Sequence, residues 1–117
     1  MNVLFVGIGG FIGAALRYLI SLIPLPNTHG FPLATLAINT LGAFALGLLI
    51  AFETRHPEIN ARILLMSKVG ICGGFTTFST FSLEAQNLLT SGKTAMAISY
   101  MVTSLVLTIL AVWLPQR

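Results

Sequence analysis

The residues best suited to chemistry are neutral hydrogen-bond donors set within otherwise apolar segments. They are one amide and a group of hydroxyls: Asn39, Thr76, Thr77, Ser79, Thr80, Tyr100, Ser104 and Thr108. Phe75, Phe78 and Phe81 recur every three residues, so their rings project from roughly one side of a helix. Ring edges carry weak positive charge. Donors and ring edges without a carboxylate suit a small, strongly hydrated anion that must lose its water.

Each of these groups also has a structural interpretation. Amides and hydroxyls hydrogen-bond between helices in membranes, so Asn39 is either an interhelical contact or a donor to a ligand. The phenylalanines are either part of the same site or packed against lipid and the core. The sequence shows no nucleophile beside a base, no metal-ligand cluster and no phosphate loop, so it gives no support for an enzyme.

The composition places these residues in a membrane protein. The chain has 117 residues, of which 56% are hydrophobic and 8% are charged, a balance outside the range of soluble domains. A membrane span needs about 20 predominantly apolar residues. We therefore predict an all-α integral membrane protein, a single domain over 1–117, with spans at about 2–23, 33–52, 63–89 and 94–114. A net charge of +3 on so few charges makes nucleic-acid binding implausible.

The third span contains the stretch around which the chain is organised, Gly70–Glu84 (GICGGFTTFSTFSLE). Its glycines weaken a helix, and five of the seven residues 76–82 carry hydroxyls. We predict that the helix is broken near Gly73–Thr77, with the adjacent Gly73–Gly74 pair as the break point. Broken backbone at membrane depth must be buried in protein or reach water, which predicts a functional site. A small-residue face for close helix packing is the alternative.

The first and last spans carry three further features. Gly9 and Gly13 have the spacing of a close helix contact. Arg17, about a turn and a half from the end of its span, is either an arginine that reaches back to the interface or a fixed cation that orients loops or attracts anions. In the last span, hydroxyls at positions 100, 104 and 108 recur every four residues and form a polar stripe.

Four spans are too few to enclose a polar pathway, so we expect a second copy to supply the missing wall. The charged segment Glu53–Arg62 is interpreted as a solvated loop. Four basic residues lie toward the face of the two termini (Arg55, Arg62, Lys68 and Arg117), against Arg17 and Lys93 toward the other. This small bias predicts a chain that can insert both ways up.

Three stretches together resemble the Fluc (CrcB) family of fluoride channels: GGFIGAALRY (Gly9–Tyr18), LAINTLGAF (Leu36–Phe44) and GICGGFTTFSTF (Gly70–Phe81). They occur in the order found in the family, and the third is the most specific. The resemblance implies an antiparallel, dual-topology homodimer with two pores in a bacterial inner membrane. It also implies that toxic fluoride leaves the cell by passive permeation.

The resemblance further implies roles for individual residues. The residues expected to line the pores are Asn39, Phe78, Ser79, Phe81, Tyr100, Ser104 and Thr108. A structural sodium ion at the dimer axis is expected to bind backbone carbonyls, which correspond to Gly73 and Thr76. Oxygen ligands at a helix break are physically reasonable, because the break frees carbonyls that need a partner.

Two other classes remain as alternatives. One is a small, dual-topology, proton-coupled exporter of cationic compounds, which would want a carboxylate in the first span; here that span has Arg17 and no acid. The other is a non-transporting assembly subunit, which would explain the glycines but not the donors. Uptake of fluoride, protons or cations by liposomes containing the protein separates the three.

Overall fold

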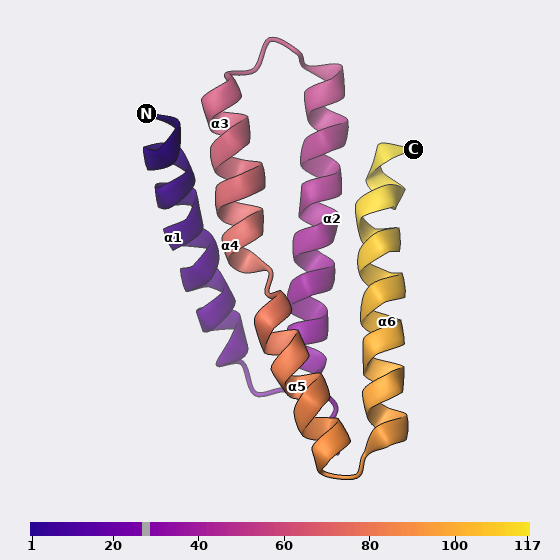
Figure 1. Cartoon of the computed structure of the whole chain (residues 1–117). Coiled ribbons are helices and arrows are strands. Elements are labelled where there is room, and N and C mark those ends of the chain that lie inside the picture. Colours follow the sequence, from indigo (N-terminus) through magenta and orange to yellow (C-terminus); the bar gives the residue numbers. More distant parts are fainter. Residues whose placement is uncertain (27–28) are drawn as a thin grey trace.

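The computed structural model describes residues 1–26 and 29–117, and every regular element in these ranges is a helix (Figure 1). Three stretches of the chain are simple: α1 (Asn2–Ser21), α2 (Leu33–Arg55) and α6 (Thr94–Trp113), which ends in the short 3-10 turn η2 (Leu114–Gln116). Both termini lie at the same end of the bundle as the α2–α3 connection.

The third membrane segment is assembled from four pieces. They are α3 (Ala61–Leu65), the π-helix η1 (Met66–Cys72), α4 (Gly73–Phe75) and α5 (Phe78–Thr90). Only Thr76 and Thr77 separate α4 from α5. The π-helical stretch was not predicted. Such segments are rare and occur frequently at functional sites.

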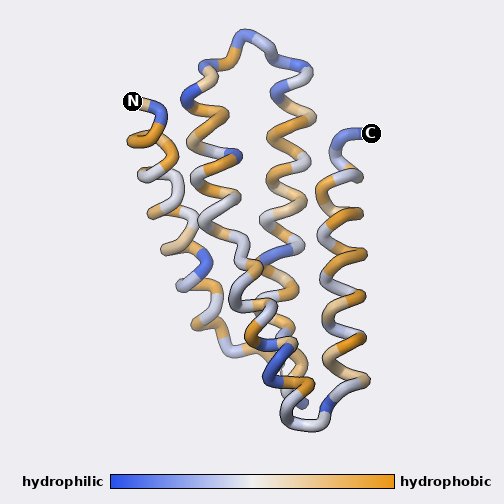
Figure 2. The backbone as a smooth tube through the Cα atoms, in the orientation of Figure 1, coloured by the Kyte–Doolittle hydropathy of each residue, from blue (hydrophilic) through white to orange (hydrophobic). Residues whose placement is uncertain are grey.

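The described chain has four helical segments that are long and apolar enough to cross a membrane: 2–21, 33–55, 61–90 and 94–116. The prediction of four membrane-crossing helices is confirmed in this sense. Apolar residues run along the helices, and polar residues gather mainly in the connections and at one end of α5 (Figure 2). Large apolar side chains such as Val3, Phe11 and Phe78 are 77–85% exposed. This outward-facing apolar surface suits a protein whose solvent is lipid.

One sequence interpretation needs correction. Glu53 and Arg55 do not belong to a loop, because α2 continues through them to Arg55. Glu53 accepts a hydrogen bond from Lys68 of η1, which ties the end of α2 to the third segment. Glu53 therefore has an interhelical partner, and the charged connection is shorter than predicted.

Glycines bring α1 into direct backbone contact with the third segment. A Cβ atom placed on Gly9 would lie 2.9 Å from the Cα of Gly70, and one placed on Gly13 would lie 2.8 Å from the backbone nitrogen of Phe75. Both distances are shorter than real Cβ contacts. The predicted Gly9–Gly13 contact is thus confirmed, and it holds α1 against η1 and α4.

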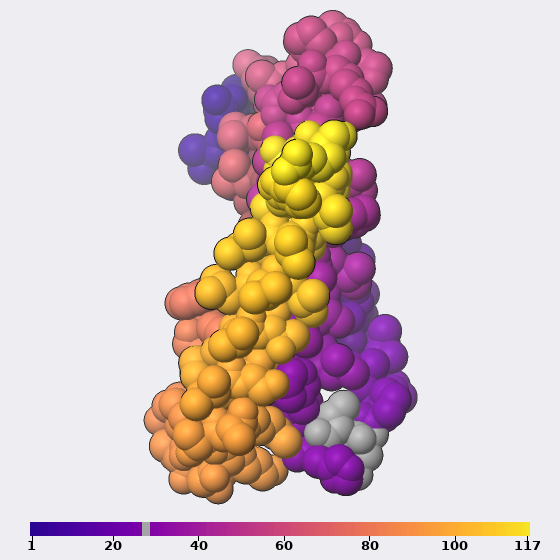
Figure 3. Space-filling model, turned by 90° about the vertical axis from the view of Figure 1, so that its right-hand side faces the viewer, coloured from indigo at the N-terminus to yellow at the C-terminus, as the bar shows by residue number. Residues whose placement is uncertain are grey.

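The main cluster of buried apolar residues is small and lies where α5 and α6 meet the start of α2. It consists of Leu36, Ala85, Leu88, Ala97 and Tyr100. The molecule is elongated, with extents of 51 × 30 × 22 Å. From the side (Figure 3), α6 runs obliquely along the long axis, from the α5–α6 turn to the end that carries both termini.

Candidate functional site

The break in the third segment falls at Thr76 and Thr77, whose backbones are extended (φ −79°, ψ 157° and φ −147°, ψ 119°). The break lies within the predicted range, but the Gly73–Gly74 pair is not the break point, because both glycines are helical in α4. Gly74 instead packs against the backbone of Gly10. Gly74 therefore allows close packing, whereas a Cβ on Gly73 would meet nothing within 4 Å, and another residue must stabilise the break.

That residue is Asn39, whose side-chain amide binds both backbone groups of Thr77. Its Oδ1 accepts from the Thr77 N–H at 2.7 Å, and its Nδ2 donates to the Thr77 carbonyl at 2.9 Å. The amide thus gives the Thr77 N–H the acceptor that the break takes away, and it adds a second bond to the Thr77 carbonyl. Leaving such groups unpaired in lipid would cost several kcal/mol each. One N–H of Nδ2 is not used in this pairing and remains available as a donor.

The threonines complete the local structure on either side of the break. Thr77 is the N-cap of α5, and its Oγ1 accepts from the Thr80 N–H at 3.3 Å. The Thr76 hydroxyl donates to the Cys72 carbonyl at 3.0 Å, an acceptor it shares with its own backbone N–H. Hydroxyls at these positions therefore stabilise the ends of both helices, as capping residues do.

Arg17 of α1 also hydrogen-bonds to the backbone next to the break. Its Nε donates to the carbonyl of Gly74 at 3.2 Å, and the side chain is partly buried. In an unbroken helix that carbonyl would accept from residue 78. Of the two interpretations of Arg17, the structure supports a fixed cation, although it holds a broken helix rather than a loop.

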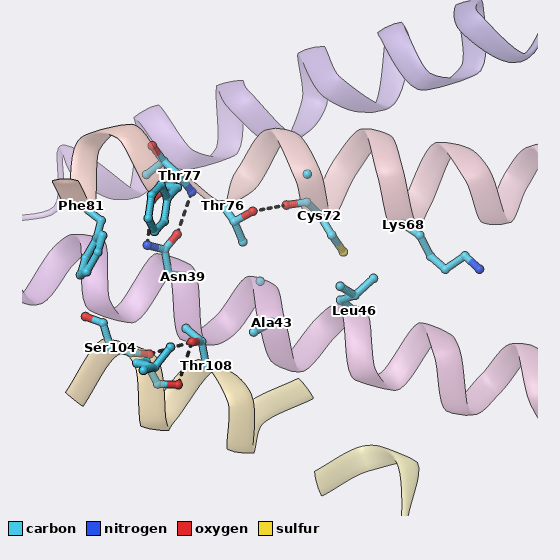
Figure 4. Close-up of a pocket in the computed structure, with 14 residues that line it drawn as sticks. Asn39, Ala43, Leu46, Lys68, Cys72, Thr76, Thr77, Phe81, Ser104 and Thr108 are labelled. Atoms are coloured by element: carbon cyan, nitrogen blue, oxygen red, sulfur yellow. Dashed lines mark hydrogen bonds between the residues drawn. The ribbon is translucent and has the colours of Figure 1, made fainter. Parts of the chain in front are cut away.

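A cavity of about 430 Å³ adjoins the break, between the third segment, α2 and α6 (Figure 4). Its lining includes these residues predicted from the sequence: Asn39, Gly73, Thr76, Phe78, Phe81, Ser104 and Thr108. Lys68 is the one charged residue among the described residues that line it. The lining therefore brings together seven residues that the sequence singled out, five as pore-lining and two, Gly73 and Thr76, as sodium ligands.

The hydroxyls of α6 differ in their availability. Thr108 donates to the Ser104 carbonyl at 2.7 Å, whereas the buried Ser104 Oγ has no hydrogen-bond partner among the described residues. A buried hydroxyl without a partner is unfavourable unless something else binds it. Ser104 lines the cavity, so its hydroxyl has an O–H that no described residue accepts at this wall.

Two predicted residues, Ser79 and Tyr100, lie outside this lining. Ser79 is exposed, with its Oγ 3.4 Å from the Thr77 hydroxyl. Tyr100 is completely buried, and its hydroxyl donates to Glu84 at 2.8 Å. The structure places Tyr100 beside the cavity wall, with its ring centroid 5.1 Å from that of Phe81.

Sequence reasoning did not assign a role to Glu84 or Thr35. The two oxygens of Glu84 accept from Tyr100 and, at 2.8 Å, from the hydroxyl of Thr35. This carboxylate therefore joins α2, α5 and α6 at one point. A single acid within an apolar span was the available signal, because such a group needs partners.

Aromatic rings continue from the cavity toward this cluster. The rings of Phe78 and Phe81 lie 5.5 Å apart and tilted, and Phe31 meets Tyr100 edge to face at 5.5 Å. Phe78 is 79% exposed, so its ring extends beyond the chain's own packing. The arrangement offers ring edges next to neutral donors, with no acid among the described lining residues.

These features define a class: a small multi-pass membrane protein with an interrupted third span beside a cavity of neutral donors. The sequence model described as "CrcB-like protein, Camphor Resistance (CrcB)" matches residues 4–116. The chain belongs to this CrcB-like family.

Curated relatives resemble it over most of their length. A protein of Ruminiclostridium cellulolyticum is 50% identical over 106 residues, covering 90% of this chain and 82% of that protein. One of Clostridium perfringens (strain 13 / Type A) is 42% identical over 115 residues, covering 97% and 90%. One of Shewanella halifaxensis is 43% identical over 117 residues, covering 99% and 94%. Each is named "Fluoride-specific ion channel FluC". The family resemblance predicted from the three motifs is confirmed.

Proposed function

We propose that the chain forms a fluoride-selective ion channel through which fluoride leaves the cell passively. The observation that carries this proposal is the cavity at the helix break. The cavity is lined by Ser104, whose hydroxyl has no partner, by Asn39, which has a spare N–H, and by the rings of Phe78 and Phe81. None of its described lining residues is an acid. The names of the relatives support it. The channel is not an enzyme, because its work is to replace water around an ion.

The chemistry of the lining favours fluoride over chloride. Fluoride is small and strongly hydrated, so its passage requires donors that replace water at each step. Asn39 and Ser104 supply such groups along the cavity, and ring edges extend the series. The Thr108 hydroxyl lies in the same wall and donates to the Ser104 carbonyl. Chloride accepts hydrogen bonds more weakly and gains less from the same donors. The donors are neutral, so they bind the anion without trapping it.

Phe78 and Ser79 point to a second copy of the chain. Both residues are exposed in the single chain, although Phe78 borders the cavity. We assign them to a wall that an antiparallel copy completes, so that a dual-topology homodimer in a bacterial inner membrane holds two pores. Tyr100 supports the wall of this path from behind Phe81, and its buried hydroxyl donates to Glu84.

Backbone oxygens at the break fit a sodium ion. The Thr77 N–H, which in a helix would donate to Gly73 O, donates to Asn39 instead. The Thr80 N–H, which would donate to Thr76 O, donates to Thr77 Oγ1. Gly73 and Thr76 therefore each present a carbonyl whose helix donor is engaged elsewhere, and hard oxygen donors suit hard cations. Such an ion, when bound, neutralises the carbonyl dipoles and holds the break together.

Reconstituted liposomes test the channel directly. Vesicles loaded with fluoride should release it at a rate proportional to the amount of protein, as followed by a fluoride electrode. Matched vesicles loaded with chloride should not. Fluoride release that requires a proton gradient, or uptake of cationic dyes, would favour the exporter instead. If the vesicles transport neither fluoride, protons nor cations, the result would favour the non-transporting assembly subunit.

A further inference from the structure

Lys68 gives the cavity one charged end. In Figure 4 the lining residues run in a row from Phe81, past Asn39 and Cys72, to Lys68 at the opposite end. Every other described lining residue is neutral. An anion that reaches the cavity from this end meets an ammonium group before it meets the neutral donors.

The ammonium is not free, because Glu53 of α2 accepts from it at 2.5 Å. The side chains of Lys68 and Glu53 are 27% and 39% exposed, so the pair is only partly buried, and Lys68 borders the cavity. Ion pairs this open to their surroundings are weak and can exchange partners. An ammonium also carries three donors, and a single carboxylate contact does not use them all.

We propose that the Lys68 ammonium collects anions at the entrance of the cavity and that Glu53 is its built-in competitor. The inference rests on the proposed function, because it takes the permeating ion to be fluoride. A lone ammonium beside a path of neutral donors would bind fluoride strongly and release it slowly. Conduction needs sites that are favourable to enter and weak enough to leave. When the Glu53 carboxylate binds the Lys68 ammonium again, it displaces the anion, which then leaves in either direction along the path.

The two partners should therefore act in opposite directions on fluoride affinity. Lys68→Gln removes the collecting charge, so the fluoride concentration giving half-maximal flux should rise about threefold or more. Glu53→Gln removes the competitor, so this concentration should fall by a similar factor, and the maximal flux should fall with it. A purely structural ion pair predicts that both variants change stability and flux in the same direction.

The experiment measures fluoride flux into liposomes against fluoride concentration for the wild type, both single variants and the double variant. Arg62→Gln is the matched control, because it removes one exposed positive charge at the same end of the bundle outside the cavity lining. It should leave the half-maximal concentration unchanged. The double variant should lie near Lys68→Gln, since a competitor has no effect once its target is gone.

The outcomes separate the inference from the proposed function. No fluoride flux in the wild type overturns the channel and the inference together. Normal wild-type flux, with the two variants shifted in the same direction or not at all, overturns the inference alone. If Lys68→Gln does not assemble, Glu53→Gln decides, because it keeps the lysine. An unchanged or raised half-maximal concentration in that variant contradicts the proposed competition.

Discussion

At the scale of single residues, two polar side chains of the site hydrogen-bond to backbone groups at the helix break. Asn39 binds both peptide groups of Thr77, and Arg17 binds the carbonyl of Gly74. Ser104, by contrast, has a buried hydroxyl with no partner among the described residues. Substitutions should therefore fall into two groups. Those of the first group destabilise the break, and those of the second change fluoride flux without changing stability.

Asn39→Asp belongs to the first group. A carboxylate cannot donate to the Thr77 carbonyl, and it places a negative charge in the cavity. We expect fluoride flux to be lost and the unfolding free energy to fall by about 1–3 kcal/mol, the cost of removing the donor from a partly buried acceptor. Liposome flux and denaturant unfolding in detergent measure the two effects. Asn87→Asp, on the exposed face of α5, is the control, and equal loss in both variants would contradict the assignment.

Phe78→Ile and Phe81→Ile belong to the second group. Isoleucine keeps an apolar side chain but removes the ring edge, so the path loses its weakly positive contacts. We expect at least about a tenfold loss of fluoride flux for either variant with assembly unchanged, equal to about 1.4 kcal/mol in the barrier. Flux assays and size-exclusion chromatography provide the test. Phe44→Ile alters an exposed ring outside the cavity and should transport normally.

At the scale of elements, the interrupted third segment is where sequence and structure differ most. Four apolar runs predicted the helices because their length and composition suffice. The glycines and hydroxyls of Gly70–Glu84 predicted a break, but not its position. Breaking at Thr76 and Thr77 depends on Asn39, 38 residues away. The partner of Arg17 is 57 residues away, and those of Glu84 are 49 and 16 residues away, separations that local patterns do not reveal. Neither does any local pattern explain the π-helix η1.

The glycine contact between α1 and the third segment gives a test at this scale. Gly13→Ala would place a Cβ against the backbone of Ile71 and Phe75, which cannot move aside as a flexible side chain can. We expect destabilisation of about 1–3 kcal/mol from overpacking. Gly7→Ala in the same helix is the matched control, because nothing lies within 4 Å of its Cβ. Unfolding midpoints of the two variants in detergent should differ clearly, and equal midpoints would refute the close contact.

At the scale of the whole molecule, both ends of the chain lie on one face and the charge bias between faces is small. Adding lysines to the connection at residues 56–60 should therefore fix one orientation. A version locked in the opposite sense can be made by adding lysines beside Lys93. We expect each locked version alone to lose at least about 90% of the fluoride flux and co-expression to restore it, if the pores need antiparallel copies. Full activity of a single locked version would rule out that assembly.

The proposed sodium site is also a property of the assembled molecule. Gly73 and Thr76 offer carbonyls from one chain, and an ion shared by two chains would join them. Exchanging sodium for a larger monovalent cation should lower both flux and the unfolding midpoint of the dimer. Flux and thermal unfolding in the two salts measure this effect. Equal values in both salts would remove the ion from the proposal.

The pairing of Asn39 with Thr77 also has a consequence for biosynthesis. The third segment leaves the ribosome after α2, and its extended residues carry peptide groups that lipid cannot satisfy. It can settle in the bilayer only beside a helix that is already there and presents an amide at the right depth. Asn39 is synthesised before Thr76 and Thr77, so the amide that pairs with Thr77 is present before the broken segment is made.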